Sequence, residues 1–267
     1  MNEEKEDLFA ELDNEPLPVK DAVRRVMNLY YLIDTSGSMS GSRIESINQV
    51  MPEVVQLVAD ISNSNNDTAE IKVNALCFST GSHWMYSKPL AANDFKWIDC
   101  KAGGVTDLGH ACENLEKHLH RTEDLGSEQG HFAPAVILLS DGAPNDNFEK
   151  GYKKLSENPW FKSAAKIAIA IGTEVDNKVL CKFVGEDAAK EAVLTVHDAQ
   201  SLKDIIRLVS CSVSRHGSAP VSTDNKSQEE LLVEDIKSGL KDMPNETTYD
   251  KAQDVIDVKP LGDDLFD

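Results

Sequence analysis

The sequence predicts an α/β protein with a doubly wound, mostly parallel sheet of about six strands and helices on both faces. Three apolar runs, at 26–33, 134–140 and 166–171, lack the polar alternation of a half-exposed strand. Such runs are typical of strands that are buried on both faces. Segments with helical spacing of apolar residues lie between the predicted strands. This alternation of strands and helices favours a parallel sheet that is covered on both sides.

The first predicted strand, at 26–33, has the sequence VMNLYYLI and is followed by a segment in which apolar residues recur at helical spacing from 44 to 61. Pro52 lies inside that predicted helix. Proline removes one backbone hydrogen bond and clashes with the preceding turn. We therefore expect Pro52 to kink the helix or to divide it in two.

The next segments predict two further strands, a glycine loop and a helix. EIKVNALCFS at 70–79 is the second strand, and HWMYSKPL at 83–90 is a short edge strand. Pro89 fits an edge because proline cannot donate to a neighbouring strand. The glycine loop KAGGVTD at 101–107 leads into a helix that ends near 119.

The second half of the chain continues the alternation. Strands are predicted at 134–140, 166–171 and 192–196, and helices at 146–158, 177–185 and 199–213. The pattern ends there, so we place the α/β domain at 26–214, between an acidic extension at 1–25 and an acidic tail at 215–267 that we expect to be disordered.

The acidic ends carry most of the net charge of −19. Solvated disorder is the simplest interpretation of such segments. Both ends also contain the tripeptide DLF, within EDLFAELD at 6–13 and within DDLFD at 263–267. Coincidence explains this repeat, but a linear motif that docks on a partner, or on the site described next, is the alternative.

Composition excludes several classes of partner. A net charge of −19 gives no electrostatic attraction for nucleic acid. Since no apolar run reaches the roughly 18 residues that span a bilayer, no membrane partner is expected. The acidic N-terminus does not resemble a secretory signal. The five cysteines form no CxxC pair and fit a reducing compartment, so we expect a cytoplasmic protein.

Oxygen-bearing side chains gather where the predicted strands end. Asp34 and Asp141 each end an apolar strand, Ser36 and Ser38 follow Asp34, and Thr106 lies on the glycine loop. Ligands of doubly wound sheets bind beyond the carboxyl ends of the strands. A set made only of oxygen atoms suits Mg²⁺ or Mn²⁺. The candidate metal ligands are therefore three hydroxyls and two or three carboxylates, the third carboxylate being that of Asp107 beside Thr106.

Helix capping is the alternative explanation of these residues. Taken alone, DTSGS at 34–38 fits a helix N-cap, in which a side-chain oxygen accepts from free backbone N–H groups. Three separate segments with oxygen atoms at strand ends or helix entries favour the metal site instead. Asp107 fits equally well as a helix cap and as support for the ligands.

Three sequences, LIDTSGSM, GGVTDLGHA and LLSDGAP, resemble in order the three parts of the metal-ion-dependent adhesion site (MIDAS) of von Willebrand factor A-type domains. The resemblance covers roughly residues 26–214, with Val105 as an additional residue before the threonine. Within that family, SGSMSGSRIESIN, the proline-interrupted helix and AIAIG…VLCKFVG resemble the TerY-like proteins associated with tellurium resistance. Some of those relatives carry a C-terminal zinc ribbon, and no cysteine follows Cys211 here.

The resemblance implies that Ser36, Ser38 and Thr106 bind the cation through their hydroxyls, and that Asp34 and Asp141 act directly or through water. The family leaves one metal position open for an Asp or Glu of a protein partner. TerY-like proteins are associated with a protein kinase and a metal-dependent protein phosphatase, which are partners by analogy only. The implied function is a metal-dependent protein-binding adaptor in a cytoplasmic bacterial stress response similar to tellurite resistance.

Enzymatic activity is not expected. A haloacid dehalogenase-like phosphotransferase needs a second aspartate where Ser36 stands, and GSMSG at 37–41 does not match the GxSxG motif of serine hydrolases. The sequence contains no GxxxxGK[ST] phosphate-binding loop. Two alternatives to the adaptor remain, a Mg²⁺-dependent phosphohydrolase and a substrate-adaptor subunit of an AAA+ ATPase complex.

Overall fold

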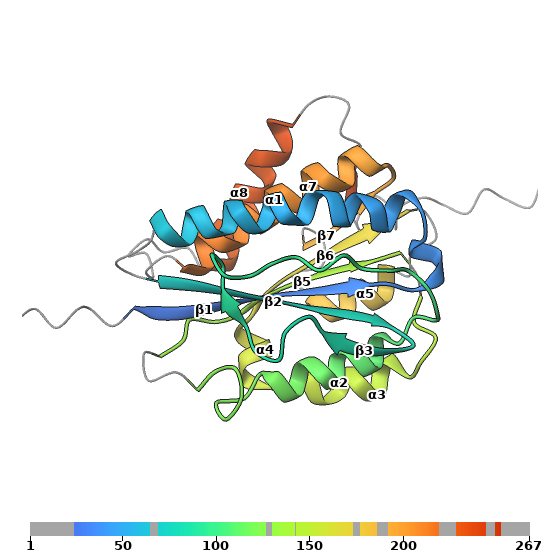
Figure 1. Cartoon of the computed structure of the whole chain (residues 1–267), viewed down its shortest axis with the longest axis horizontal. Coiled ribbons are helices and arrows are strands. Elements are labelled where there is room, and N and C mark those ends of the chain that lie inside the picture. The colour runs from blue at the N-terminus through green and yellow to red at the C-terminus, as the bar shows by residue number, and fades with distance from the viewer. Residues whose placement is uncertain are drawn as a thin grey trace, which may run out of the picture.

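The computed structural model has one sheet of eight strands with helices on both faces (Figure 1). It describes residues 24–64, 69–126, 130–141, 143–172, 177–185, 192–218, 228–243 and 249–251. The predicted fold class is confirmed. Both DLF-containing segments lie outside the described residues.

Five parallel strands form the centre of the sheet, and three short antiparallel strands lie at its edges. The parallel strands are β1 (Arg25–Asp34), β2 (Ala69–Ser79), β5 (Ala135–Ser140), β6 (Ala165–Ile171) and β7 (Val193–Val196). The antiparallel strands are β3 (Gly81–Trp84), β4 (Leu90–Ala91) and β8 (Tyr249–Lys251). Every residue of β5, and every residue of β1 after Arg25, is buried, which explains their continuous apolar sequences.

The strand order β3-β2-β1-β5-β6-β7-β8, with β4 beside β2, places β1 at a reversal of the chain path. The chain leaves β1 for β2 on one side, and later strands continue on the other side, beginning with β5. Ile33 of β1 is in register with Leu139 of β5, so both strands end at the same edge of the sheet. This edge is a topological switch point, where ligands of such sheets bind.

Helices cover both faces of the sheet. On one face, α1 (Ser42–Ser64) lies beside α7 (Ala199–Ser218), as Figure 1 shows above the sheet. The other face carries α2 (Leu108–His118), α3 (Phe148–Glu157), α4 (Pro159–Ser163) and α5 (Asn177–Val184). Phe161 of α4 packs edge-on against Phe183 of α5, with ring centroids 5.4 Å apart. Among the described residues, no helix has the length and hydropathy needed to cross a membrane.

Pro52 does not divide the first helix, because α1 continues through it to Ser64. Proline removes only one hydrogen bond, and the buried face of α1, which includes Met51 and Val54, packs in the hydrophobic core. The expected edge strand at 83–90 is two short strands instead, β3 and β4, which pair with different parts of β2.

The expectation of a disordered tail from residue 215 is wrong for three segments. The helix α7 continues to Ser218, α8 (Gln228–Lys241) packs on α7, and β8 pairs with β7. The reason is apolar burial: Leu232, Ile236 and Leu240 recur at helical spacing and are buried in the main core. Glu234 and Asp235 lie between two of these positions, so the average composition hides the apolar face.

Candidate metal centre

The carboxylate of Asp34 is fixed at the end of β1 by two hydrogen bonds. One oxygen, Oδ1, accepts from the backbone N–H of Ser36 at 2.8 Å, and Oδ2 accepts from the hydroxyl of Ser140 at 2.7 Å. Burial raises the pKa of Asp34, and the hydrogen bonds from Ser140 and Ser36 partly offset that effect. Asp34 is therefore a buried carboxylate held by Ser140 of β5 and by the loop that follows β1.

A chain of close oxygen atoms leads from Ser36 to Asp141. Ser36 Oγ lies 3.0 Å from Ser38 Oγ, and the Ser38 hydroxyl donates to Asp141 Oδ1 at 2.8 Å, across 103 residues of sequence. In an octahedral site with Mg²⁺–oxygen bonds of about 2.1 Å, adjacent ligand oxygens lie about 3 Å apart. The spacing of these three oxygens therefore fits two edges of a magnesium coordination shell.

Arg43, on the first turn of α1, holds the other side of the Asp141 carboxylate. Its guanidinium donates to Asp141 Oδ2 and, at 3.1 Å, to the carbonyl oxygen of Ser38. Since Oδ2 is engaged by Arg43, Oδ1 is turned toward the serine hydroxyls. Arg43 was not among the predicted site residues, although it follows the serine motif directly in the sequence.

Two backbone hydrogen bonds hold the glycine loop beside the serine motif. Gly37 N–H donates to the carbonyl of Gly104 at 3.0 Å, and Gly103 N–H donates to the carbonyl of Thr35 at 2.8 Å. Gly104 has a φ of +84°, and a Cβ there would lie 2.6 Å from Thr80 Oγ1. The positive φ favours glycine at this position, and an added Cβ would also have to displace the Thr80 hydroxyl.

Thr106 is buried, and hydrogen bonds of its backbone hold it in position. Its N–H donates to Asn145 Oδ1 at 2.8 Å, and its carbonyl accepts from the N–H of Asn145 at the same distance. Asn145 follows β5 and Asp141, so this reciprocal pair joins the glycine loop to the segment that carries the second carboxylate. Sequence reasoning missed Asn145 because a contact between distant loops has no local signal.

Asp107 does not cap α2 with its side chain. It occupies the N-cap position, but its Oδ2 accepts from Gly81 N–H at 2.7 Å, which ties the loop to the turn between β2 and β3. Asp146 supplies the missing acceptors, since its carboxylate accepts from Gly109 N–H at 3.0 Å and from His110 N–H at 2.8 Å. These contacts rule out a side-chain cap by Asp107 and place its carboxylate in the support of the loop that carries Thr106, which agrees with the second alternative, support for the ligands.

The structure thus brings Asp34, Ser36, Ser38 and Asp141 to one edge of the sheet, and the loop of Thr106 lies against the same serine motif. Within the described ranges, no cluster of three or more His, Cys, Asp or Glu has the arrangement of a metal site. That finding does not count against the candidate centre, because the centre has only two carboxylates and its other oxygen atoms are hydroxyls.

Comparison with known protein families matches most of the α/β region to one family. The sequence model of the von Willebrand factor type A domain family matches residues 28–208. A comparison with curated protein sequences found no significant match.

Solved structures with the same fold come from distant relatives. A von Willebrand factor type A protein from Catenulispora acidiphila has 16% identity and a TM-score of 0.54, over 71% of this chain and 43% of that one. Proximal thread matrix protein 1 from the mussel byssus, described with a zinc-occupied MIDAS motif, has 20% identity and a TM-score of 0.53, over 72% and 48%. The pilus adhesin SpaC from Lactobacillus rhamnosus GG has 11% identity and a TM-score of 0.56, over 72% and 30%.

These likenesses show the fold alone, because all three identities are low. The chain spans less than half the length of each of these three structures.

Proposed function

The chain belongs to the von Willebrand factor type A domain family, and from this premise we propose that it binds a divalent cation and through it an acidic side chain of a protein partner. The observation that carries the proposal is the run of close oxygen atoms from Ser36 through Ser38 to Asp141. The proposed ligands are Asp34, Ser36, Ser38, Thr106 and Asp141. Their hard oxygen atoms favour Mg²⁺ or Mn²⁺.

A cation held largely by neutral hydroxyls keeps part of its positive charge. An incoming carboxylate then makes a charge-assisted contact, which is stronger than a contact between neutral groups. The residues of this chain hold the ligands in place: Ser140 orients Asp34, and Arg43 orients Asp141. The mussel protein described with a zinc-occupied MIDAS motif supports a metal-binding role for this edge of the fold.

Substitution of Ser38 tests the proposed metal centre. Ser38→Ala removes the hydroxyl between Ser36 and Asp141, and we expect Mg²⁺ or Mn²⁺ affinity to fall at least about 10-fold, as measured by isothermal titration calorimetry. Ser40→Ala is the matched control, because the Ser40 hydroxyl is exposed and donates to the carbonyl of Gly37. Equal affinity of Ser38→Ala and wild type would rule out this assignment of ligands.

We further propose a binding role without catalysis, in a stress-response system similar to tellurite resistance, with a protein kinase and a metal-dependent phosphatase as candidate partners. Co-purification from native cells with and without EDTA tests the metal-dependent partner.

A phosphatase assay tests the alternative of a Mg²⁺-dependent phosphohydrolase. We expect no turnover by wild type. Turnover by wild type that Asp34→Ala abolishes would show a Mg²⁺-dependent phosphohydrolase instead.

A further inference from the structure

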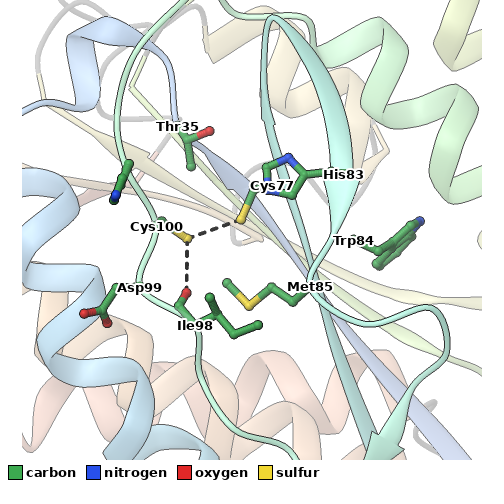
Figure 2. A pocket seen from close by; sticks show the side chains of 9 residues that line it. Thr35, Cys77, His83, Trp84, Met85, Ile98, Asp99 and Cys100 are labelled. Atoms are coloured by element: carbon green, nitrogen blue, oxygen red, sulfur yellow. Dashed lines mark hydrogen bonds between the residues drawn. The ribbon is translucent and has the colours of Figure 1, made fainter.

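Two cysteines, far apart in sequence, approach each other beside the candidate metal centre. Cys77 lies on β2 and Cys100 lies between β4 and α2, and their sulfur atoms are 3.2 Å apart (Figure 2). Both side chains are buried, and both cysteines are free. A disulfide has a sulfur–sulfur distance of about 2.05 Å, so bond formation needs an approach of only about 1.2 Å.

The backbone around each sulfur is held in place. Asn48 of α1 binds both polar groups of the Cys100 backbone: its Oδ1 accepts from Cys100 N–H at 2.8 Å, and its Nδ2 donates to the Cys100 carbonyl at 2.9 Å. Trp97 Nε1 also donates to Asn48 Oδ1, at 3.1 Å. Cys77 is paired with Ile33 of β1 on one side and with His83 of β3 on the other. The two sulfurs therefore face each other from fixed supports.

A cavity of about 300 Å³ gives access to this pair. Cys77 and Cys100 line it together with other residues, among them Thr35, His83 and Met85 (Figure 2).

The pKa of the Cys100 thiol is raised, mainly by the hydrogen bond with Cys77 and secondly by burial. Because the thiolate is the reactive form, this raised pKa should slow oxidation of Cys100 near neutral pH, and the rate of oxidation should increase as the pH rises.

We propose that Cys77 and Cys100 form a reversible dithiol–disulfide pair that is oxidised by a peroxide. One sulfur, as its thiolate, attacks a peroxide oxygen and becomes a sulfenic acid, while the other oxygen leaves and takes up a proton. The second sulfur then attacks the sulfenic sulfur, and the hydroxyl leaves as water. With hydrogen peroxide, two thiols lose two electrons and two protons, the peroxide is reduced to two waters, and a dithiol reductant reverses the reaction.

The disulfide would act on the loop that carries Thr106, a consequence that rests on the proposed function. Cys100 precedes Gly103 by three residues, and Gly103 N–H is bonded to the carbonyl of Thr35, next to Asp34. A Cys77–Cys100 bond joins the entry of this loop to β2. A loop that is already held loses less freedom when it binds a cation, so the oxidised protein should bind Mn²⁺ several-fold more tightly.

The full chain, reduced and then treated with hydrogen peroxide without denaturant, tests the proposal by alkylation and tryptic mass spectrometry. Lys96 separates the two cysteines in the digest, so the disulfide appears as a cross-linked pair of peptides. We expect two of the five thiols to be lost, the cross-link to disappear on reduction, and the melting temperature of the oxidised protein to rise by roughly 5 °C.

Cysteine variants and Mn²⁺ binding measurements distinguish failure of the dithiol pair from failure of the proposed function. Cys77→Ala and Cys100→Ala should each abolish the cross-link, whereas Cys112→Ala, a buried cysteine of α2, should retain it. Wild-type protein in which both thiols stay alkylatable, or become sulfinic acids without a cross-link, would overturn the dithiol pair. A cross-link without a change in Mn²⁺ affinity would overturn only the effect on the loop. Absence of Mn²⁺ binding in either redox state would instead contradict the proposed function.

Discussion

Asp146 supports the first turn of α2 with both of its carboxylate oxygens, although it lies 36 and 37 positions from the residues it binds. The first N–H groups of a helix have no partner inside the helix, and a negative charge there is favourable. This role falls to Asp146 because Asp107, at the N-cap position, binds the turn between β2 and β3 instead. One carboxylate thus holds the start of α2, directly after the loop that carries Thr106.

Substitution of Asp146 should therefore destabilise the protein. We expect Asp146→Ala to lower the free energy of unfolding by about 1–2 kcal/mol, measured by urea denaturation, because two backbone N–H groups lose their acceptor. Asp94→Ala is the control, since Asp94 is exposed in a surface turn and its loss should change stability by less than about 0.5 kcal/mol. Equal effects of the two substitutions would contradict the capping role.

At the scale of elements, α2 and α3 approach closely through glycines. A Cβ on Gly151 of α3 would lie 2.0 Å from the carbonyl oxygen of Gly109 in α2, and a Cβ on Gly109 would lie 2.7 Å from the carbonyl oxygen of Asn147. These are backbone atoms, which cannot turn aside as a flexible side chain can. The close packing therefore sets the position of α2, and with it the loop that enters α2.

Gly151→Ala tests this contact. In a free helix the change from glycine to alanine stabilises by about 1 kcal/mol, but here the added methyl overlaps a backbone oxygen. We expect a loss of about 3 kcal/mol in the free energy of unfolding, measured by thermal or urea denaturation. Lys154→Ala, on the exposed face of the same helix, should change stability by less than about 0.5 kcal/mol. A gain in stability in Gly151→Ala would show that the helices separate without cost.

At the scale of the whole molecule, β1 connects to both halves of the sheet and ends in the candidate centre. Its neighbours are β2 on one side and β5 on the other, and the residues that follow β1 touch both the glycine loop and Asp141. A cation at this point would bind three parts of the folded chain that are separate in the unfolded chain. Metal binding should therefore stabilise the native fold as a whole.

Thermal unfolding with and without Mg²⁺ measures this coupling. A ligand at 100 times its dissociation constant adds about 2.7 kcal/mol to the stability of a fold that alone binds it. For a domain of this size, we expect the melting temperature to rise by roughly 5–10 °C and to return to its starting value with EDTA. The rise should fall to about half or less in Ser38→Ala, as a 10-fold or greater loss of affinity requires, and it should be retained in Ser40→Ala. An equal rise in Ser38→Ala would place the stabilising cation elsewhere.

Much of the fold follows from local sequence. The apolar runs at 26–33 and 134–140 correspond to β1 and β5, and the helical spacing from 44 to 61 corresponds to α1. Burial on both faces demands continuous apolar sequence, so these elements carry a strong local signal. In the acidic C-terminal region the average composition was misleading, because a few apolar residues at helical spacing, such as Ile236, were enough to bury one face of α8.

By itself, the sequence determined the fold class and the five oxygen-bearing candidate ligands, because periodicity and short motifs are local properties of the chain. Tertiary structure alone decided which distant groups support them: Arg43 on Asp141, Asn145 on Thr106, and Cys77 near Cys100. The physical reason is that each of these contacts joins segments that meet only after the parallel strands have paired. Nothing in the spacing of residues along the chain records such a meeting.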